Sequence, residues 1–311
     1  MDFLIFSCNS NRALAEGITA NLGMRLGAAM VNKFSDGEIN IKINESVRGR
    51  EVFIVQSICT PSDTHLMELM IMTDALMRAS AASITAVIPY FGYSRQDRMV
   101  EPRVSITAKL IANLLAKAGI NRLVTMDLHA GQIQGFFDIP VDNLYAMPVM
   151  SRYLNEKFTD HSSCVVVSPD AGGVTRARVL AKHLNCPLAM VDKRRTGPNV
   201  AKAMNVIGDV EGKYAIIIDD MIDTAGTLVE SSNAILNKGA KGVIACATHG
   251  VLSGPALERI ASSGMDEVVI TDTIPLTNSV SKIRQLSVAS LFATSIERIY
   301  KKESISSLFD S

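Results

Sequence analysis

The sequence contains no tryptophan, has few aromatic residues, and has no excess of either charge. Lys and Arg together number 31, as do Asp and Glu, so the formal net charge is zero. A protein that coats DNA or RNA needs a basic excess, and a polyacidic tail needs the reverse. The sequence fits neither class, so any charged ligand must be recognised by a local group of residues.

Long apolar runs and paired cysteines are also absent. The two longest stretches without a charged residue, 79–94 and 242–257, have 16 residues each, whereas a membrane span needs about 20 apolar residues. An acidic residue, Asp2, stands where a signal peptide carries a basic region. The five cysteines are scattered and form no CxxC pair, so we expect neither disulfides nor a zinc site. These features predict a cytoplasmic protein that does not bind membranes.

Hydrophobic residues make up 48% of the 311 residues, enough for a large core and for two domains. Short apolar runs alternate with segments of helical period. Most of the runs are apolar on both faces, which is typical of parallel strands covered by helices on both sides. The sequence therefore predicts an α/β fold. The expected strands are 3–8, 52–57, 84–90, 122–128, 164–168, 189–192, 215–218, 243–248 and 267–270.

The alternation runs twice along the chain, with a break near Ala146. We expect two similar domains, 1–146 and 147–286, each a mostly parallel sheet flanked by helices, followed by a helical segment, 287–311. Segments 51–57 and 214–220 correspond weakly, and Gln56 and Ser57 stand where the second copy has two Asp residues. The expected helices are 11–22, 64–80, 106–118, 149–158, 173–184, 227–238 and 255–262.

The strongest local motif is segment 216–228, where an apolar strand is followed by two carboxylates and a loop of small residues before a helix. Small residues let backbone N–H groups approach an anion, and the helix start adds partial positive charge, so the loop can hold a phosphate. The carboxylates can accept hydrogen bonds from sugar hydroxyls. Alternatively, Asp223 or Thr224 only caps the helix. The candidate residues are Asp219, Asp220, Asp223, Thr224, Ala225, Gly226 and Thr227.

This motif resembles the phosphoribosyl-diphosphate binding motif of the type I phosphoribosyltransferase fold. Further segments in the same order extend the likeness over nearly the whole chain, which resembles the ribose-phosphate pyrophosphokinase (PRPP synthetase) family. The resemblance implies two phosphoribosyltransferase-like domains, with the C-terminal helix packed on the first. No Walker A or GxGxxG sequence occurs. The matching segments are 34–38, 87–98, 126–130, 167–173 and 192–195.

The resemblance implies a reaction in which the 1-hydroxyl of ribose 5-phosphate attacks the β-phosphorus of ATP, giving phosphoribosyl diphosphate (PRPP) and AMP. PRPP feeds nucleotide, histidine, tryptophan and NAD synthesis. Lys193 and Arg195 would be the catalytic cations, because such a transfer concentrates negative charge on phosphate oxygens. We expect segment 196–203 to form a mobile lid. On its own, this basic run could equally be a solvated loop.

The resemblance also assigns the magnesium and nucleotide sites. His129 and Asp170 would bind the Mg²⁺ that accompanies ATP, and the carboxylate suits this hard cation better than the imidazole does. Segment 34–38 would come from a neighbouring subunit of a homo-oligomer, a hexamer, whose active sites are shared between subunits. Without the resemblance, it is only an Asp-Gly turn between extended segments. The ATP-binding residues would be Phe34, Asp36, Gly37, Glu38, Arg95 and Gln96.

Serine and arginine side chains at further positions resemble a regulatory site for ADP or for inorganic phosphate as activator. Hydroxyl groups and guanidinium forks suit phosphate, although each residue could equally be an ordinary surface residue. The candidates are Ser46, Arg48, Arg78, Arg103, Ser105, Ser304, Ser306 and Ser307.

Two other functions share some of these features. A type I phosphoribosyltransferase would share segment 219–227, but the doubled domain and the Lys193–Arg195 pair argue against it. A non-catalytic regulatory relative would act through protein contacts. The presence of Lys193, Arg195, His129 and Asp170 argues against that reading.

Overall fold

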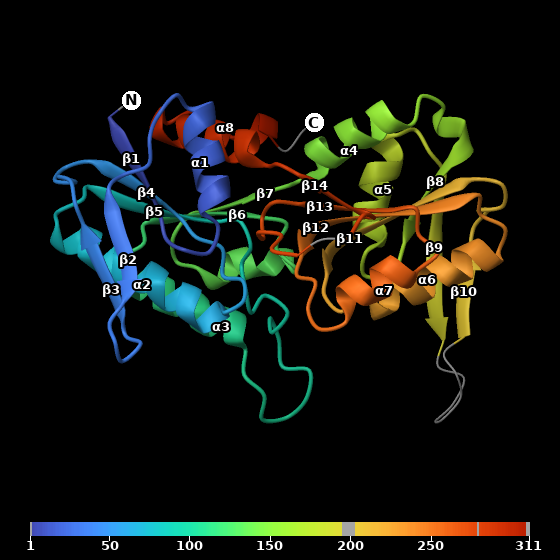
Figure 1. Ribbon diagram of the computed structural model, residues 1–311, viewed down its shortest axis with the longest axis horizontal. Coiled ribbons are helices and arrows are strands. Elements are labelled where there is room, and N and C mark those ends of the chain that lie inside the picture. Colours follow the sequence, from blue (N-terminus) through green and yellow to red (C-terminus); the bar gives the residue numbers. More distant parts are fainter. Residues whose placement is uncertain (1, 195–202, 279, 309–311) are drawn as a thin grey trace. The chain divides into compact units, whose positions relative to one another are not determined.

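The computed structural model describes residues 2–194, 203–278 and 280–308. The chain forms two compact units. The first consists of Met1–Tyr145, Thr273–Pro275 and Ser287–Ser311, and the second of Ala146–Asp272 and Leu276–Leu286. Each is an α/β unit built on one main sheet (Figure 1). Within the described residues, no helix is long and apolar enough to cross a membrane.

The main sheet of the first unit is entirely parallel and follows chain order, β1-β4-β5-β6-β7. Helices α2 (Ser62–Arg78) and α3 (Thr107–Ala118) cover one face, and α1 (Arg12–Asn21) and α8 (Ala289–Tyr300) lie side by side on the other (Figure 1). Strands β2 (Ala29–Lys33) and β3 (Ile39–Ile43) form a separate antiparallel hairpin. The five sheet strands are β1 (Phe3–Ser7), β4 (Glu51–Val55), β5 (Ser83–Ile88), β6 (Arg122–Met126) and β7 (Val141–Leu144).

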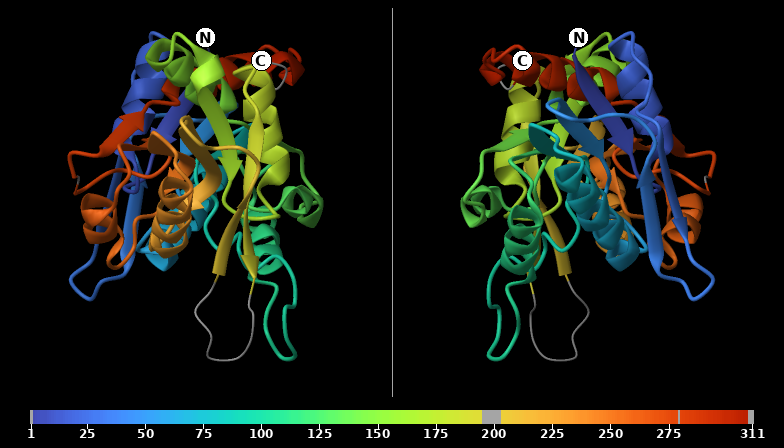
Figure 2. Two further views of the ribbon diagram at one scale, coloured as in Figure 1. Left: turned by 90° about the vertical axis from the view of Figure 1, so that its right-hand side faces the viewer. Right: turned by 90° about the vertical axis from the view of Figure 1, so that its left-hand side faces the viewer.

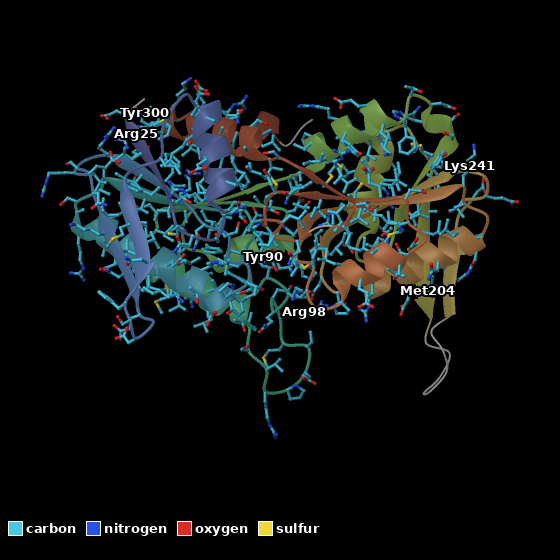
Figure 3. All side chains as sticks on the ribbon, viewed as in Figure 1. Arg25, Tyr90, Arg98, Met204, Lys241 and Tyr300 are labelled. Atoms are coloured by element: carbon cyan, nitrogen blue, oxygen red, sulfur yellow. The ribbon has the colours of Figure 1, made fainter. Side chains whose placement is uncertain are left out.

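Both faces of this sheet are buried because successive strand residues point to opposite sides. Leu4 and Phe6 belong to the core beneath α2 and α3. On the other face, the ring centroid of Phe3 lies 5.2 Å from that of Phe53 and 4.8 Å from that of Tyr300, which ends α8 (Figure 3). These contacts explain why the apolar runs show no alternation between polar and apolar residues.

The main sheet of the second unit has the order β10-β9-β8-β11-β12-β13-β14, and every pairing is parallel except that of β10 with β9. Helices α4 (Met147–Lys157) and α5 (Val174–His183) cover one face, and α6 (Gly226–Asn237) and α7 (Ala256–Ser262) cover the other (Figure 1). The strands are β8 (Cys164–Ser168), β9 (Leu188–Arg194), β10 (Ala203–Ile207), β11 (Tyr214–Ile222), β12 (Gly242–Gly250), β13 (Glu267–Thr271) and β14 (Ile283–Leu286).

The α/β architecture expected from the sequence is confirmed, but several strands were not predicted. Strands β7, β10 and β14 lie at sheet edges and are short and partly polar, so they lack a continuous apolar run. Lys193, which precedes the expected lid, lies in β9, and β9 continues to Arg194 because its backbone pairs with β10. Only the last residue of the expected lid, 196–203, is wrong. Ala203 begins β10, and residues 196–202 of the expected lid lie outside the described residues.

The first unit contains a buried polar network at the ends of β1 and β4. Glu68 of α2 is 3% exposed, and its carboxylate accepts hydrogen bonds from the backbone N–H of Asn9 (3.1 Å), from Asn9 Nδ2 (2.7 Å) and from Gln56 Nε2 (2.8 Å). The Gln56 side-chain carbonyl in turn accepts from the Ser10 N–H at 3.0 Å. A buried carboxylate is stable only when its oxygens have such donors.

We expect Glu68→Ala to lower the free energy of unfolding by about 2–4 kcal/mol, because it removes a buried acceptor to which the buried Gln56 amide and two N–H groups of Asn9 donate. Thermal and urea unfolding followed by circular dichroism measure this. The matched control is Glu16→Ala. Glu16 is exposed on α1 and pairs with Arg12 at the surface, so its loss should cost about 0.5 kcal/mol or less. Equal effects of the two changes would contradict a structural role for the network.

Candidate functional site

The candidate site lies where the strand order of the second unit reverses. From β8 the chain moves outward to β9 and β10, and it then returns to the opposite side of β8 as β11. In open α/β sheets, ligands bind beyond the carboxyl ends of the strands at such a reversal. The two loops that leave these ends are 169–173, before α5, and 223–225, before α6.

Asp219 and Asp220 lie within β11, because the pairing with β12 continues past them to Ile222. Asp220 is 6% exposed, and its backbone N–H donates to Asp219 Oδ1 at 2.8 Å. Arg176 Nη1 from α5 lies 3.7 Å from Asp219 Oδ1 and 3.5 Å from Asp220 Oδ1. One cation therefore faces two carboxylates across the reversal point.

Sequence reasoning missed Arg176. It lies in the first turn of α5, three residues after the loop that carries Asp170. A basic residue early in a helix carries no distinctive signal, and its partners are more than 40 residues further along the chain. Only the pairing of β8 with β11 brings the start of α5 to the carboxylates.

The pKa of the Asp219 carboxyl is raised to about 7, first because burial disfavours its charged form and then because Asp220 is adjacent. The Asp220 N–H and the Arg176 guanidinium oppose this rise without cancelling it. The fold thus disfavours ionisation of Asp219 beside Asp220 in spite of Arg176. A ligand that brings hydroxyl donors or a cation would favour the ionised pair.

The loop between β11 and α6 has the form expected for phosphate binding. Ala225 precedes the helix in the left-handed region, with φ of 58°, and no side chain caps the helix start. The carboxylate of Asp223 instead accepts a hydrogen bond from Ser253 Oγ. The N-cap position is thus taken by Ala225 rather than by Asp223 or Thr224. A left-handed residue followed by a helix start makes successive N–H groups converge, which is the geometry of an anion-binding nest.

The residues expected to bind metal are exposed. Asp170 follows β8, and its Oδ1 accepts a hydrogen bond from the Gly173 N–H at 3.0 Å. His129 follows β6 in the first unit. Among the described residues, no three His, Cys, Asp or Glu side chains gather into a metal cage. Mg²⁺ does not need such a cage, because one or two carboxylates together with substrate phosphates commonly hold it.

The expected nucleotide residues lie on two exposed segments of the first unit. Phe34, Asp36, Gly37 and Glu38 form the tip of the β2–β3 hairpin, which projects beyond the sheet in Figure 2. The Phe34 N–H donates to the Glu38 carbonyl at 2.8 Å, and Phe34 is 54% exposed. Gln96 lies beside the start of α3, where its Oε1 accepts from Thr107 Oγ1 at 2.5 Å. Arg95 precedes it and is exposed.

All eight candidate regulatory residues belong to the first unit. Arg78 Nε pairs with Asp74 at 2.7 Å, and Ser304 Oγ donates to Ser306 Oγ at 3.0 Å. Ser46 and Arg48 are exposed after β3, and Arg103 and Ser105 are exposed before α3. The side chain of Ser307 lies outside the described residues, as do the side chain of Lys193 and all of Arg195.

Comparisons with known proteins match this chain to one family. Residues 3–119 match the model of the N-terminal domain of ribose phosphate pyrophosphokinase, and residues 194–310 match the phosphoribosyl synthetase-associated domain. The chain is 56% identical to the ribose-phosphate pyrophosphokinase of Campylobacter jejuni over 307 residues, covering 99% of each. It is 57% identical to that of Caldanaerobacter subterraneus, covering 98% of this chain and 97% of the relative.

The crystal structure of phosphoribosylpyrophosphate synthetase from Mycobacterium smegmatis superposes with a TM-score of 0.92, at 41% identity, over 97% of this chain and 100% of that one. The fold and the site define an α/β enzyme of the phosphoribosyl-diphosphate class. The chain belongs to the ribose-phosphate pyrophosphokinase family. The resemblance found in the sequence is confirmed, and the comparisons support neither a phosphoribosyltransferase nor a non-catalytic relative.

The raised pKa of Asp219 predicts a pH-dependent effect of Asp219→Asn in the absence of substrate and metal. An unfolded Asp has a pKa of about 4. The carboxyl therefore binds a proton more tightly when folded, and wild-type stability falls as pH rises from about 4 to about 7. The asparagine variant lacks this loss. The melting temperature of the variant minus that of the wild type should therefore increase from about pH 4 to about pH 7 and stay constant at higher pH.

Thermal melts of both proteins at half-unit pH steps measure this difference. The matched control is Asp209→Asn. Asp209 is exposed and pairs with Lys213, which lowers its carboxyl pKa, so its contribution to stability is lost only at acid pH. Its melting-temperature difference should be flat between pH 5 and 8. A flat difference for Asp219→Asn over the same range would contradict the raised pKa.

Proposed function

We propose that the protein transfers the pyrophosphoryl group of ATP to the 1-hydroxyl of ribose 5-phosphate, giving PRPP and AMP. The observation that carries this proposal is the carboxylate pair Asp219–Asp220 beside a phosphate-binding loop at the strand reversal of the second unit. Family membership supports the reaction type. The first unit would serve ATP, and the second would serve the sugar phosphate.

The second unit offers complementary groups for the two ends of ribose 5-phosphate. The N–H groups of the loop from Asp223 to Thr227 would hold the 5-phosphate. The oxygens of Asp219 and Asp220 would accept from the ring hydroxyls, and this binding would leave the 1-hydroxyl as the attacking group. Its oxygen forms a bond to the β-phosphorus as the bond from that phosphorus to the α-phosphate oxygen breaks, and its proton is lost.

The transferring group carries negative charge that cations must balance. Lys193 and Arg195 would bring that positive charge, and the position of Lys193 in β9 ties it to the same sheet as the sugar site. Asp170 and His129 are exposed, and each would supply one ligand to Mg²⁺. The Mg²⁺ would neutralise phosphate charge and orient the triphosphate. Catalysis here is chiefly positioning and electrostatic stabilisation.

The remaining assignments follow from the exposed segments of the first unit. Phe34 would stack on adenine and Asp36 and Glu38 would accept from its amino group, with Arg95 and Gln96 completing the ATP site. The exposed hairpin tip supports a site completed by a second subunit in a homo-oligomer, for which we propose a hexamer. The serines and arginines named above would bind regulatory phosphate or ADP. The free cysteines support a cytoplasmic location.

Lys193→Ala should lower kcat by about 100-fold or more while leaving ribose 5-phosphate binding nearly intact, because the cation acts mainly in the transition state. Phosphorus NMR of the protein with ATP, ribose 5-phosphate, Mg²⁺ and inorganic phosphate measures the formation of PRPP and AMP. Lys182→Ala, an exposed lysine on α5, is the control and should match the wild type. Failure of the wild type to form PRPP would contradict the proposed function.

Mixed oligomers test the shared site. Phe34→Ala and Lys193→Ala should each be nearly inactive alone. If Phe34 serves a neighbouring subunit, co-refolding the two variants creates some sites with both wild-type residues, and activity should return to about a quarter of the wild-type value. This fraction follows from random mixing of equal amounts of the two variants. No recovery, in mixtures shown to exchange subunits, would place both residues in a site within one chain.

A further inference from the structure

The phosphate loop is held from behind by the segment that follows β12. Three successive carbonyl oxygens, of the last residue of β11 and the first two residues of the loop, accept hydrogen bonds from this segment. The Ile222 carbonyl accepts from the Leu252 N–H at 3.0 Å, and the Asp223 carbonyl accepts from the Ser253 N–H at 3.0 Å. The Thr224 carbonyl accepts from Arg259 Nη1 at 2.9 Å.

This pattern is not that of a strand. In an extended strand, successive carbonyls point to opposite sides, so neighbouring residues cannot all bind one partner segment. Here residues 222 to 224 all direct their carbonyls to the same side. Leu252, with φ of 50°, is in the left-handed region, and this lets two consecutive N–H groups, its own and that of Ser253, face the loop together.

The planarity of the trans peptide bond determines where the neighbouring N–H groups point. In each peptide unit, the C=O and the following N–H point in opposite directions. Because the three carbonyls point towards segment 252–259, the N–H groups of Asp223, Thr224 and Ala225 point away from it. They therefore face the side from which an anion would enter.

Arg259 provides the charged contact in this arrangement. It extends from α7, which contacts α6, and its guanidinium lies against Gly226, where a Cβ would come within 3.2 Å of Nη1. Its contact with Thr224 has two effects. It turns the Thr224 carbonyl away from the anion, and by polarising that peptide it strengthens the adjacent Ala225 N–H as a donor.

We propose that Arg259 is a positioning residue for the 5-phosphate: it holds the loop in its anion-binding form through the Thr224 carbonyl and so sets the affinity for ribose 5-phosphate. This inference rests on the proposed function of the loop. Arg259 does not touch the reacting atoms. Its loss should therefore affect binding of the sugar phosphate and spare the chemical step.

Arg259→Ala should raise KM for ribose 5-phosphate about tenfold, the effect expected for loss of one charged hydrogen bond, with kcat and KM for ATP changed less than about twofold. Titration of ribose 5-phosphate by calorimetry without ATP should show the same loss of affinity. Arg152→Ala, which removes an exposed arginine on α4, is the matched control and should leave all of these values at wild type.

Two conservative variants separate positioning from general structural support. Arg259 contacts the Thr224 carbonyl through Nη1, so Arg259→Lys can replace both charge and donor and should restore affinity to within about threefold of wild type. Arg259→Gln keeps a donor without charge and should fall between Lys and Ala. The melting temperature of all three variants should stay near the wild-type value, because the side chain is exposed.

An unchanged KM for ribose 5-phosphate in Arg259→Ala would overturn the proposal, as would an equal rise in both KM values or a lysine variant as weak as the alanine variant. Because binding is titrated without ATP, it is independent of turnover. Absence of PRPP synthesis in the wild type contradicts the proposed function, and the titration still decides the role of Arg259.

Discussion

The arrangement of the second unit depends on two adjacent carboxylates held inside a strand of its main sheet. Burial and the neighbouring Asp220 disfavour the charged form of Asp219, and Arg176 supplies one positive charge to the pair. The pairing of β11 with β12 fixes the backbone that carries both carboxyls. In the proposed function, a ligand with hydroxyl donors would favour the ionised pair.

The first unit has no acidic pair at the corresponding position of its strand-loop-helix unit. Gln56 and Ser57 follow β4 where the acidic pair stands in β11, and both are bound by their own chain. Glu68, a buried acid, has three hydrogen bonds from Asn9 and Gln56 rather than a like-charged neighbour. The buried acid of the first unit is satisfied by neutral donors, whereas the acidic pair of the second unit has Arg176 and a like-charged neighbour.

The sequence predicted the elements with strong local signals. Apolar runs identified the central strands, and the motif at 216–228 predicted the loop for which we propose phosphate binding, because each depends on residues close together in the chain. The edge strands β7, β10 and β14 form only because a neighbouring strand pairs with them. Arg176 and Arg259 were missed for the same reason. Their partners are fixed by sheet order, which no local pattern encodes.

The phosphate loop and the carboxylates are coupled through strand β12. Its pairing with β11 runs from Tyr214 to Ile222 and fixes the two carboxylates, and the residues just beyond its end hold the carbonyls of the loop. A shift of β12 along β11 would therefore disturb both ends of the proposed sugar-phosphate site together. Loops bind ligands well when a rigid element holds them, and here one strand holds the carboxyls proposed to bind the hydroxyls and the loop proposed to bind the phosphate at a fixed separation.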